Sequence, residues 1–233
     1  MSDTAYLALL LDGPLQSWGF SSRFQRRTTE LHPTKSGVIG LVCAAMGLAK
    51  GSPEERDILP KLAGLKMTSI AMPRKVQGAA SPMPVLRLED YHTALDTRRA
   101  SGAMNKDAVI THRQYLADAR FGVIFDGDRL VLVRAISALK DPIWGVWLGR
   151  KSCIPADPVF RGMFATQTEA ERALIGDAPI EQFTRLEEVA NFDAGSDSYN
   201  DQPVSFGTVD SSTEGRKYAV RRVNLLVGKI PDA

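Results

Sequence analysis

The sequence predicts an α+β fold, and three observations indicate it. Residues 5–11 (YLALLLD) form an apolar run of strand length that ends at the turn signal Asp12-Gly13-Pro14. An almost wholly apolar helical run follows at 37–50, and the later segments have, in order, strand, strand, helix and strand character. The order strand, helix, strand, strand, helix, strand, with insertions, is the split pattern of a ferredoxin-like, RRM-like core. Because many unrelated proteins share this topology, it does not define a function by itself.

Residues 13–34, between the first strand and the first helix, predict a long loop. They are rich in Gly, Ser, Arg and Thr and have no hydrophobic periodicity. Loops of this length inside a compact domain are usually functional or disordered. The buried helix begins where Thr34 or Ser36 can cap it, and we expect it to end at Lys50-Gly51.

A second helix has a clear N-terminal signature, in which Ser52 is the cap, a proline takes the first helical position and Glu55 completes a capping box. Residues 65–75 alternate enough to predict a strand. Residues 76–108 lack the pattern of a packed core, although 85–93 (VLRLEDYHT) are strand-like. We therefore expect a protruding hairpin or a flexible excursion in this region.

The second half of the chain predicts further elements in this order: a strand at 113–125, a turn at Asp126-Gly127-Asp128, a helix at 129–140, an aromatic and basic loop at 143–162, a helix at 168–176, an acidic stretch at 193–201, and strands near 203–209 and 217–227. We expect a main domain at 1–165. The remainder, 166–233, is expected to form a smaller C-terminal β lobe with a helix and two strands.

The composition is that of a soluble globular protein with a substantial core, since 44% of the 233 residues are hydrophobic and 24% are charged. The apolar run at 6–11 is too short for a signal-peptide core and is preceded by Asp3 rather than by a basic residue. No stretch approaches the roughly 20 apolar residues that cross a bilayer. The cysteines, Cys43 and Cys153, form neither a disulfide framework nor a metal site. We expect a cytoplasmic protein with free thiols and no membrane partner.

Charge is distributed unevenly along the chain, although the net charge is only +2. Segment 13–37 has four basic residues against one acid, and segment 213–229 has five against one. Segment 169–201 is the reverse, with nine acids and two arginines. We expect the basic regions to suit a polyanion and the acidic region to face away from it. From composition alone, solvated faces of alternating charge are the simpler alternative.

The sequence offers little for catalysis. Its three histidines, His32, His92 and His112, are not at metal-ligand spacing from another histidine, a cysteine or a carboxylate. No P-loop, dinucleotide-binding glycine motif, HExxH or GxSxG is found. We therefore expect no metal, no cofactor and no catalytic residue. Metal-free RNA cleavage is the alternative, since Tyr91, His92, Lys106 and His112 would supply a base, an acid and a cation if the excursion folded over a substrate.

Aromatic and basic side chains are interleaved in the first loop, which contains Gln16, Trp18, Phe20, Arg23, Phe24, Arg26 and Arg27. Aromatic rings stack on bases and arginines bind phosphates, so this combination suits single-stranded RNA. The loop leads to a helix start with Lys35 and Ser36, where free N–H groups and a cation would bind a phosphate. The alternative is that Trp18 packs in the core and that Arg26 and Arg27 are merely solvated.

A second basic element is Leu148-Gly149-Arg150-Lys151-Ser152, which follows Trp144 and Trp147. A glycine before two cations allows the backbone to approach a phosphate closely.

Five segments, in chain order, resemble the CasD subunits of type I-E Cascade, in the Cas-five branch of the repeat-associated RNA-binding proteins: GPLQSWG, RRTTELHPTKSGVIGLVCAAMG, DYHTAL, THRQYLADARF and WLGRKSCIPADPVF. The resemblance covers about residues 5 to 164. It implies a ferredoxin-like core with a protruding thumb at about 76–112. Such subunits bind the 5′ handle of the CRISPR RNA (crRNA), cap the Cas-seven backbone and contact the large subunit, close to target DNA at the start of the guide.

The resemblance implies RNA-binding roles for the first loop and helix start (Gln16, Trp18, Arg23, Arg26, Arg27, Lys35, Ser36), for the thumb (Tyr91, His92, Arg98, Lys106, Arg113) and for the basic turn (Arg150, Lys151, Ser152). A related subunit of type I-C systems cleaves precursor RNA and carries adjacent Lys and His residues. This sequence has no Lys-His dipeptide. We therefore expect a non-catalytic subunit, with a metal-independent endoribonuclease as the alternative.

Overall fold

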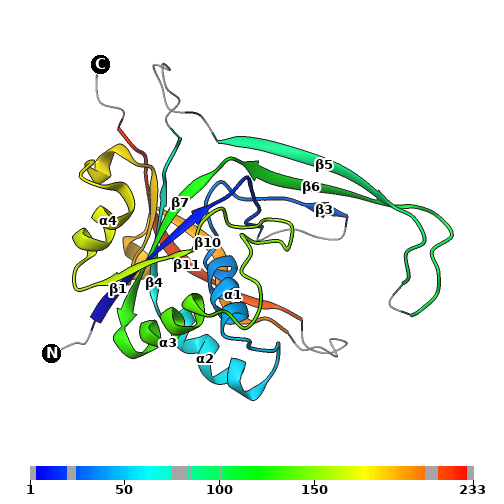
Figure 1. The fold of residues 1–233 in the computed structure, drawn as a ribbon, viewed down its shortest axis with the longest axis horizontal. Coiled ribbons are helices and arrows are strands. Elements are labelled where there is room, and N and C mark those ends of the chain that lie inside the picture. Colours follow the sequence, from blue (N-terminus) through cyan, green and yellow to red (C-terminus); the bar gives the residue numbers. More distant parts are fainter. Residues whose placement is uncertain are drawn as a thin grey trace.

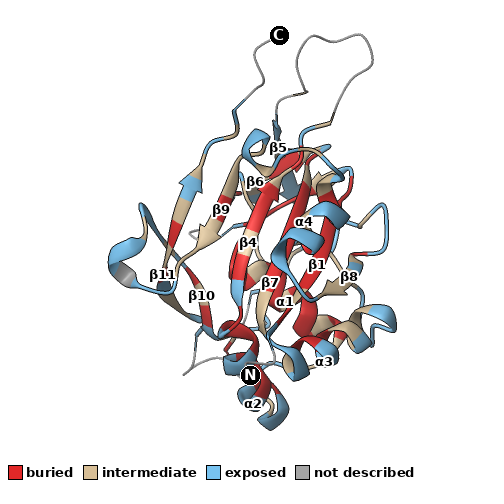
Figure 2. Ribbon diagram, turned by 90° about the vertical axis from the view of Figure 1, so that its left-hand side faces the viewer, coloured by how far each residue is buried: buried red, intermediate tan, exposed pale blue. Residues whose placement is uncertain are grey.

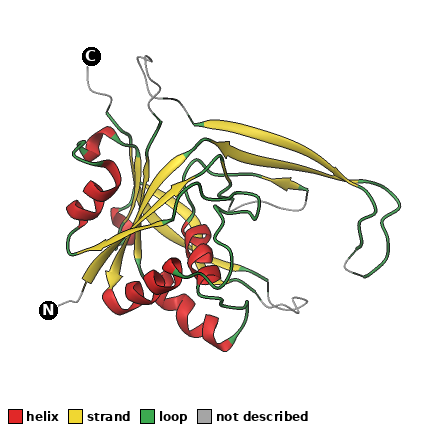
Figure 3. Cartoon of the chain, in the orientation of Figure 1, coloured by secondary structure: helices red, strands yellow, loops and turns green. Residues whose placement is uncertain are grey.

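The computed structural model describes residues 4–19, 25–74, 83, 85–99, 101–207 and 215–229. The body of the molecule is a seven-stranded sheet with helices on both faces, and a long hairpin extends away from it (Figure 1). The helices all lie in the body, whereas the hairpin consists of strand and loop (Figure 3). The predicted α+β class is confirmed.

The strands are β1 (Thr4–Asp12), β2 (Leu15–Gln16), β3 (Arg26–Arg27), β4 (Lys66–Ala71), β5 (Leu86–Ala94), β6 (Val109–Ala117), β7 (Arg120–Asp128), β8 (Phe160–Phe164), β9 (Arg185–Glu188), β10 (Asp197–Ser205) and β11 (Lys217–Leu226). The helices are α1 (Lys35–Ala45), α2 (Pro53–Ala63), α3 (Arg129–Lys140) and α4 (Gln167–Ile175), with short 3-10 helices η1 (Ile180–Gln182) and η2 (Phe192–Ala194).

The central sheet has the strand order β10-β11-β9-β4-β7-β1-β8, and its strands pair antiparallel throughout. β1 lies between β7 and β8, where Leu9 is opposite Val123 on one side and Phe160 on the other. A strand with neighbours on both edges and helices on both faces buries nearly all of its side chains, which explains its continuous apolar sequence. The buried strand predicted at 5–11 is confirmed.

Successive residues of β1 point to opposite faces of the sheet, and each face has its own hydrophobic core. Leu7, Leu9 and Leu11 pack with residues of α1, α2 and α3, whereas Ala8 and Leu10 pack with α4. Buried residues run along β1, β4, β7 and α1 (Figure 2). Each large apolar side chain buried in this way stabilises the fold by about 1.5–3 kcal/mol. The sheet is therefore a stable scaffold that positions the segments packed on its surface.

Both predicted N-terminal helices are present. α1 has Thr34 as its N-cap but ends at Ala45 rather than at Lys50, because Gly47 adopts a φ of +69° that leaves the helical region. The predicted Ser52 cap of α2 is confirmed, since its hydroxyl accepts the N–H of Glu55 at 3.1 Å. The capping box is not completed, because the Glu55 carboxylate accepts the N–H of Gly51 at 2.6 Å rather than that of Ser52.

The hairpin of β5 and β6 belongs to a second sheet with the short strands β2 and β3. Both short strands pair with one edge of β6, so the first loop runs along the base of the hairpin. The prediction of a single strand at 113–125 is wrong, because this segment is divided between β6 and β7. Asp118 has a φ of 52°, and its N–H donates to the carbonyl of Pro14 at 3.0 Å, so the chain reverses there.

The C-terminal strands β9, β10 and β11 continue the central sheet beyond β4. The strand predicted near 217–227 is found at Lys217–Leu226. The strand predicted near 203–209 begins earlier, within the acidic stretch, since β10 spans Asp197–Ser205. The division into a domain at 1–165 and a lobe at 166–233 stays a prediction. Within the described part of the chain, no helix has the length and apolar character needed to span a membrane.

Candidate nucleic-acid interface

A groove of about 630 Å³ lies between the first loop, α1, β6, the loop before β8 and the start of β11. Its lining is basic and aromatic. The cationic side chains are Arg27, Lys50, Arg113, Arg150, Lys151 and Arg216, and the aromatic ones are Trp18, Trp144, Trp147, Phe206 and Tyr218. Glu55 is the one acid among the described lining residues.

Three of these cations are held side by side at β6. Arg27 is opposite Arg113, because β3 pairs with β6 in parallel register. The Arg150 guanidinium lies 4.7 Å from the centre of the Tyr115 ring and donates to the carbonyls of Gln114 (3.1 Å) and Arg27 (2.9 Å). These contacts fix Arg150 beside the other two arginines. Like charges held this close favour a bound anion that screens their repulsion.

The far side of the groove has a second pair of cations, Lys50 and Arg216. Burial lowers the pKa of Lys50, and the charge of Arg216 lowers it further. Glu55 nearby is only 3% exposed, and its carboxylate accepts the N–H of Gly51 at 2.6 Å. A phosphate between Lys50 and Arg216 would relieve their repulsion, since an opposite charge stabilises both cations.

The glycine of the basic turn has a role in packing the chain. Gly149 adopts a φ of +91°, and a Cβ at this position would lie only 1.8 Å from the carbonyl oxygen of Ser17. The close approach expected at this glycine is therefore to the first loop of the protein itself. It positions Arg150 and Lys151 over the groove, where the Lys151 ammonium lies 5.8 Å from the centre of the Trp147 ring. Ser152 is exposed beside them.

Two residues expected to contact RNA are part of the interior. Gln16 is fully buried, and its side-chain amide donates to the carbonyls of Leu11 (2.9 Å) and Ala119 (2.7 Å). Its side-chain oxygen accepts the indole N–H of Trp18 at 3.0 Å. Trp18 is 1% exposed, so it packs in the core, as the alternative interpretation expected. Arg23 lies outside the described residues, as do Phe20 and Phe24.

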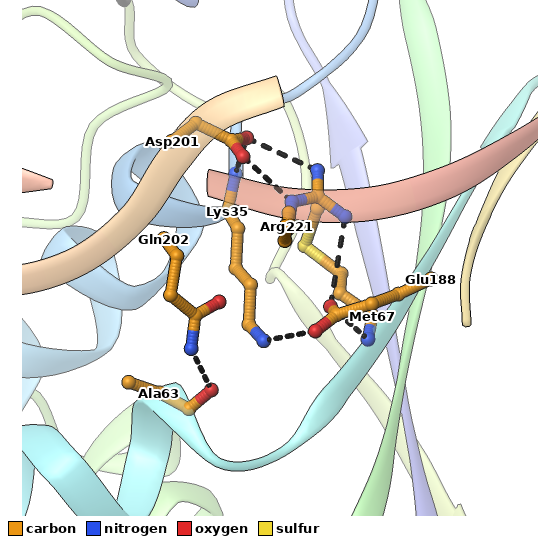
Figure 4. Close-up of polar contacts among 7 residues, drawn as sticks. All are labelled: Lys35, Ala63, Met67, Glu188, Asp201, Gln202 and Arg221. Carbon is orange, nitrogen blue, oxygen red and sulfur yellow. Dashed lines mark hydrogen bonds and ion pairs between the residues drawn. The ribbon is translucent and has the colours of Figure 1, made fainter. Parts of the chain in front are cut away.

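Lys35 is also buried, in a cluster of four charged residues (Figure 4). Its ammonium pairs with Glu188 at 2.7 Å, and its N–H donates to Asp201 at 2.7 Å. Arg221 donates to both oxygens of Asp201, at 2.6 and 3.0 Å, and its third nitrogen lies 3.5 Å from Glu188. The cluster joins the start of α1 to β9, β10 and β11.

This cluster changes what the start of α1 can bind. Burial lowers the pKa of Lys35, and the ion pair with Glu188 opposes that shift. The two cations and two carboxylates cancel, so Lys35 adds no net charge to the groove. The expectation that Lys35 binds a phosphate is therefore corrected, because the Asp201 carboxylate already accepts the backbone N–H of Lys35. Ser36, 8% exposed, lines the groove. Glu188 and Asp201, from the acidic segment 169–201, face the interior.

The hairpin residues divide between two faces. Tyr91 lies opposite His112, with ring centres 5.2 Å apart, and His112 also contacts Glu89 at 3.0 Å. His92 lies opposite Thr111, on the other face, because successive residues of a strand alternate. Tyr91 and His92 therefore do not converge on one substrate.

The remaining residues predicted from the sequence lie on exposed surfaces. Arg98 and Lys106 are exposed near the far end of the hairpin, where Arg98 forms a bridge with Met104. Arg26 is exposed and lies opposite His112, whereas its neighbour Arg27 lines the groove. The sequence reasoning did not assign Lys50 or Arg216 to the site. The position of Arg216 in the basic segment 213–229 was the feature of the sequence that could have indicated its place in the site.

An α+β fold with a basic, aromatic groove has the features that single-stranded nucleic acid requires of a binding protein. This chain belongs to the family described as CRISPR-associated protein (Cas_Cas5), whose family model matches residues 6–224. It is similar to the "CRISPR system Cascade subunit CasD" of Escherichia coli (strain K12), with 30% identity over 183 residues that cover 76% of this chain and 78% of the relative.

Solved structures agree with this assignment. A chain of a "CRISPR RNA-guided surveillance complex" is 28% identical, with a TM-score of 0.73, and the match covers 97% of this chain and 91% of the other. A crystal structure of a "Cas protein" is 29% identical, with a TM-score of 0.63, and the match covers 97% of this chain and 100% of the other.

Proposed function

We propose that this protein is a non-catalytic subunit of a type I-E CRISPR Cascade complex that binds the 5′ handle of the crRNA in the groove. The groove is the main support for the proposal, because six cations and, apart from the buried Trp18, four aromatic rings line it, and its one described acid is buried. Membership of the Cas5 family and the similarity to CasD support the place in Cascade. Capping of the Cas-seven backbone, contact with the large subunit and support of target-DNA recognition rest on the same similarity.

We assign a ferredoxin-like core to β1, α1 with α2, β4, β7, α3 and β8, since these elements follow one another in the order that such a core has. The thumb is then the hairpin of β5 and β6. Exposed apolar side chains at Leu88 (46%), Tyr91 (61%) and Leu95 (72%) suit its contact with a neighbouring backbone subunit.

Within the groove, we place phosphates against the cations and bases against Trp144, Trp147, Phe206 and Tyr218. Arg27, Arg113, Arg150 and Lys151 are the predicted residues that bind RNA directly in this arrangement. The other predicted hairpin residues, Tyr91, His92, Arg98 and Lys106, do not line the groove, and we place them against RNA beyond the handle.

Reversing two rim charges tests the proposal. In the double variant Arg27→Glu/Lys151→Glu, both side chains are exposed at the groove, so the fold should be retained. We expect the assembled complex to lose its RNA. We expect the slope of log affinity against log salt, measured by fluorescence anisotropy with single-stranded RNA, to fall in magnitude by about 1.4, since each phosphate contact contributes about 0.7.

The matched control is Lys66→Glu/Arg129→Glu, which makes the same change of charge at two exposed residues outside the groove lining. The control should bind RNA like the wild type. If the rim variant kept wild-type affinity and salt dependence, binding in this groove would be refuted.

The non-catalytic role is tested separately. Purified chain is incubated with labelled CRISPR repeat RNA in EDTA. We expect the RNA to stay intact, because His92 lies on the hairpin face opposite Tyr91 and His112. Cleavage that disappears in His112→Ala or His92→Ala would establish the ribonuclease alternative instead.

A further inference from the structure

Two hydroxyl groups in the lining of the groove, Thr34 Oγ1 and Thr111 Oγ1, are buried without a hydrogen-bond partner among the described residues. Thr34 is only 3% exposed. Buried polar groups are nearly always hydrogen-bonded, because an unpaired one has lost its water without compensation. Both hydroxyls line the same groove, so a molecule bound there would supply the partners that the described chain does not.

Helix capping does not explain the Thr34 hydroxyl. An N-cap threonine ordinarily accepts an N–H of the first helical turn, but the Thr34 side chain makes no such bond. Gly37 packs directly against it, since a Cβ at this position would lie 2.9 Å from Thr34 Oγ1 and 2.9 Å from the Trp18 ring. Gly37 itself lines the groove. Because this position has no side chain, α1 does not press a larger group against the unpaired hydroxyl at the wall of the groove.

The charge around Thr34 favours an uncharged partner. A helix N-terminus attracts phosphate, but here Asp201 already accepts the N–H of Lys35 at 2.7 Å. The charges of Lys35 and Arg221 are balanced by Glu188 and Asp201. The groove's cations come from segments other than the start of α1: β3, β6, the basic turn, Lys50 and Arg216. A ribose 2′-hydroxyl or a base edge, which can donate or accept, matches a threonine hydroxyl better than a phosphate does.

We infer that Thr34 and Thr111 form a nucleoside subsite, which hydrogen-bonds an uncharged polar group of one RNA nucleotide while the nearby cations bind its neighbouring phosphates. The inference rests on the proposed RNA binding. It specifies that the sugar or the base of a nucleotide, rather than its phosphate, contacts this part of the groove. Phosphates are the same in every nucleotide, so the cations position the RNA. The two hydroxyls give the groove a contact that distinguishes a sugar or a base.

The variants Thr34→Val and Thr111→Val test the subsite, because valine keeps the shape of threonine and removes the hydroxyl. The probe is a labelled synthetic RNA with the sequence of the 5′ segment that co-purifies with the assembled complex. We expect each variant of the full chain to bind about fivefold to tenfold more weakly, the effect of one hydrogen bond. The slope of log affinity against log salt should not change, and Thr34→Ser should bind like the wild type.

Folding is the readout that separates binding from structure. Removal of an unpaired buried hydroxyl does not remove a bond from the fold, so the thermal midpoint of Thr34→Val should equal or exceed that of the wild type. Thr93→Val is the matched control, since Thr93 is exposed on the same hairpin and does not line the groove. It should change neither the affinity nor the midpoint.

Modified probes identify the group that is bound. If a 2′-deoxy substitution in the RNA weakens binding to the wild type but not to Thr34→Val, the bound group is the sugar hydroxyl. If an abasic site weakens binding to the wild type but not to Thr34→Val, the bound group is the base. If a methylphosphonate linkage weakened binding to the wild type but not to Thr34→Val, the contact would be to a phosphate and the inference would be overturned. Wild-type affinity in both valine variants, or a lowered midpoint for Thr34→Val, would also overturn it. If the rim variant Arg27→Glu/Lys151→Glu still lost its RNA, the proposed function would stand and the subsite alone would fall.

Discussion

Replacement of Asp201 by alanine should destabilise the fold strongly, because this carboxylate joins segments that are distant in the sequence. Asp201 is fully buried, accepts the N–H of Lys35 at 2.7 Å and accepts two bonds from Arg221, at 2.6 and 3.0 Å. Alanine would leave the Arg221 guanidinium and the Lys35 N–H in the interior without this acceptor. Removal of one partner of a buried ion pair costs about 3–5 kcal/mol, a large part of the about 5–15 kcal/mol that stabilises a typical domain.

Urea denaturation followed by circular dichroism measures the loss. Asp57→Ala is the matched control, since Asp57 pairs with Lys61 at 2.8 Å but the two side chains are 61% and 49% exposed. Exposed pairs of this kind contribute about 0.5 kcal/mol or less. The double variant Asp201→Ala/Arg221→Met should be more stable than Asp201→Ala, because it no longer contains the uncompensated guanidinium. A loss below about 1 kcal/mol for Asp201→Ala would refute the reasoning.

Three further predictions concern single residues. Burial lowers the pKa of His32 to about 4, so the stability that its neutral ring provides is complete above the unfolded pKa of about 6.5 and is lost as the pH falls toward 4. Between pH 7 and pH 4, the wild type should therefore lose about 2–3 kcal/mol more unfolding free energy in urea titrations than His32→Gln, and equal losses would contradict this. Gly149→Ala should lower the thermal midpoint sharply or prevent folding, because its Cβ would lie 1.8 Å from the Ser17 carbonyl oxygen. Gly215→Ala, where the Cβ meets open space, should change the free energy of unfolding by about 0.5 kcal/mol or less, and similar midpoints for the two variants would contradict the packing role. Burial raises the pKa of the Cys43 thiol to about 12, so neither it nor the buried Cys153 should react with a thiol reagent at pH 8 until urea is added, and rapid labelling of the folded chain would disprove this.

Elements with a strong local pattern could be predicted from the sequence. The helix at 129–140 is α3, residue for residue, and the Ser52 cap of α2 was identified correctly. These features depend on side chains within a few positions of each other. The strand at 113–125 was wrong because the turn at Asp118 depends on Pro14, which is more than a hundred positions away and accepts its N–H.

The candidate site was predicted in part. Arg27, Arg113, Arg150 and Lys151 were proposed from the sequence and line the groove. Lys50 completes it from the segment between α1 and α2, and Arg216 from the residue before β11. Neither position has a local pattern that distinguishes a groove cation from a solvated one.

The sequence by itself determined the α+β class, the order of most elements and the basic, aromatic character of two segments. Only the tertiary structure decided which cations are available to a ligand. Lys35 and Arg27 are eight positions apart in the same basic segment, 13–37. Lys35 nevertheless pairs inside the protein with Glu188, 153 positions away, whereas Arg27 lines the groove. The reason is physical. A cation is neutralised by whatever carboxylate the fold brings within a few ångströms, and that distance depends on how strands far apart in the chain are paired.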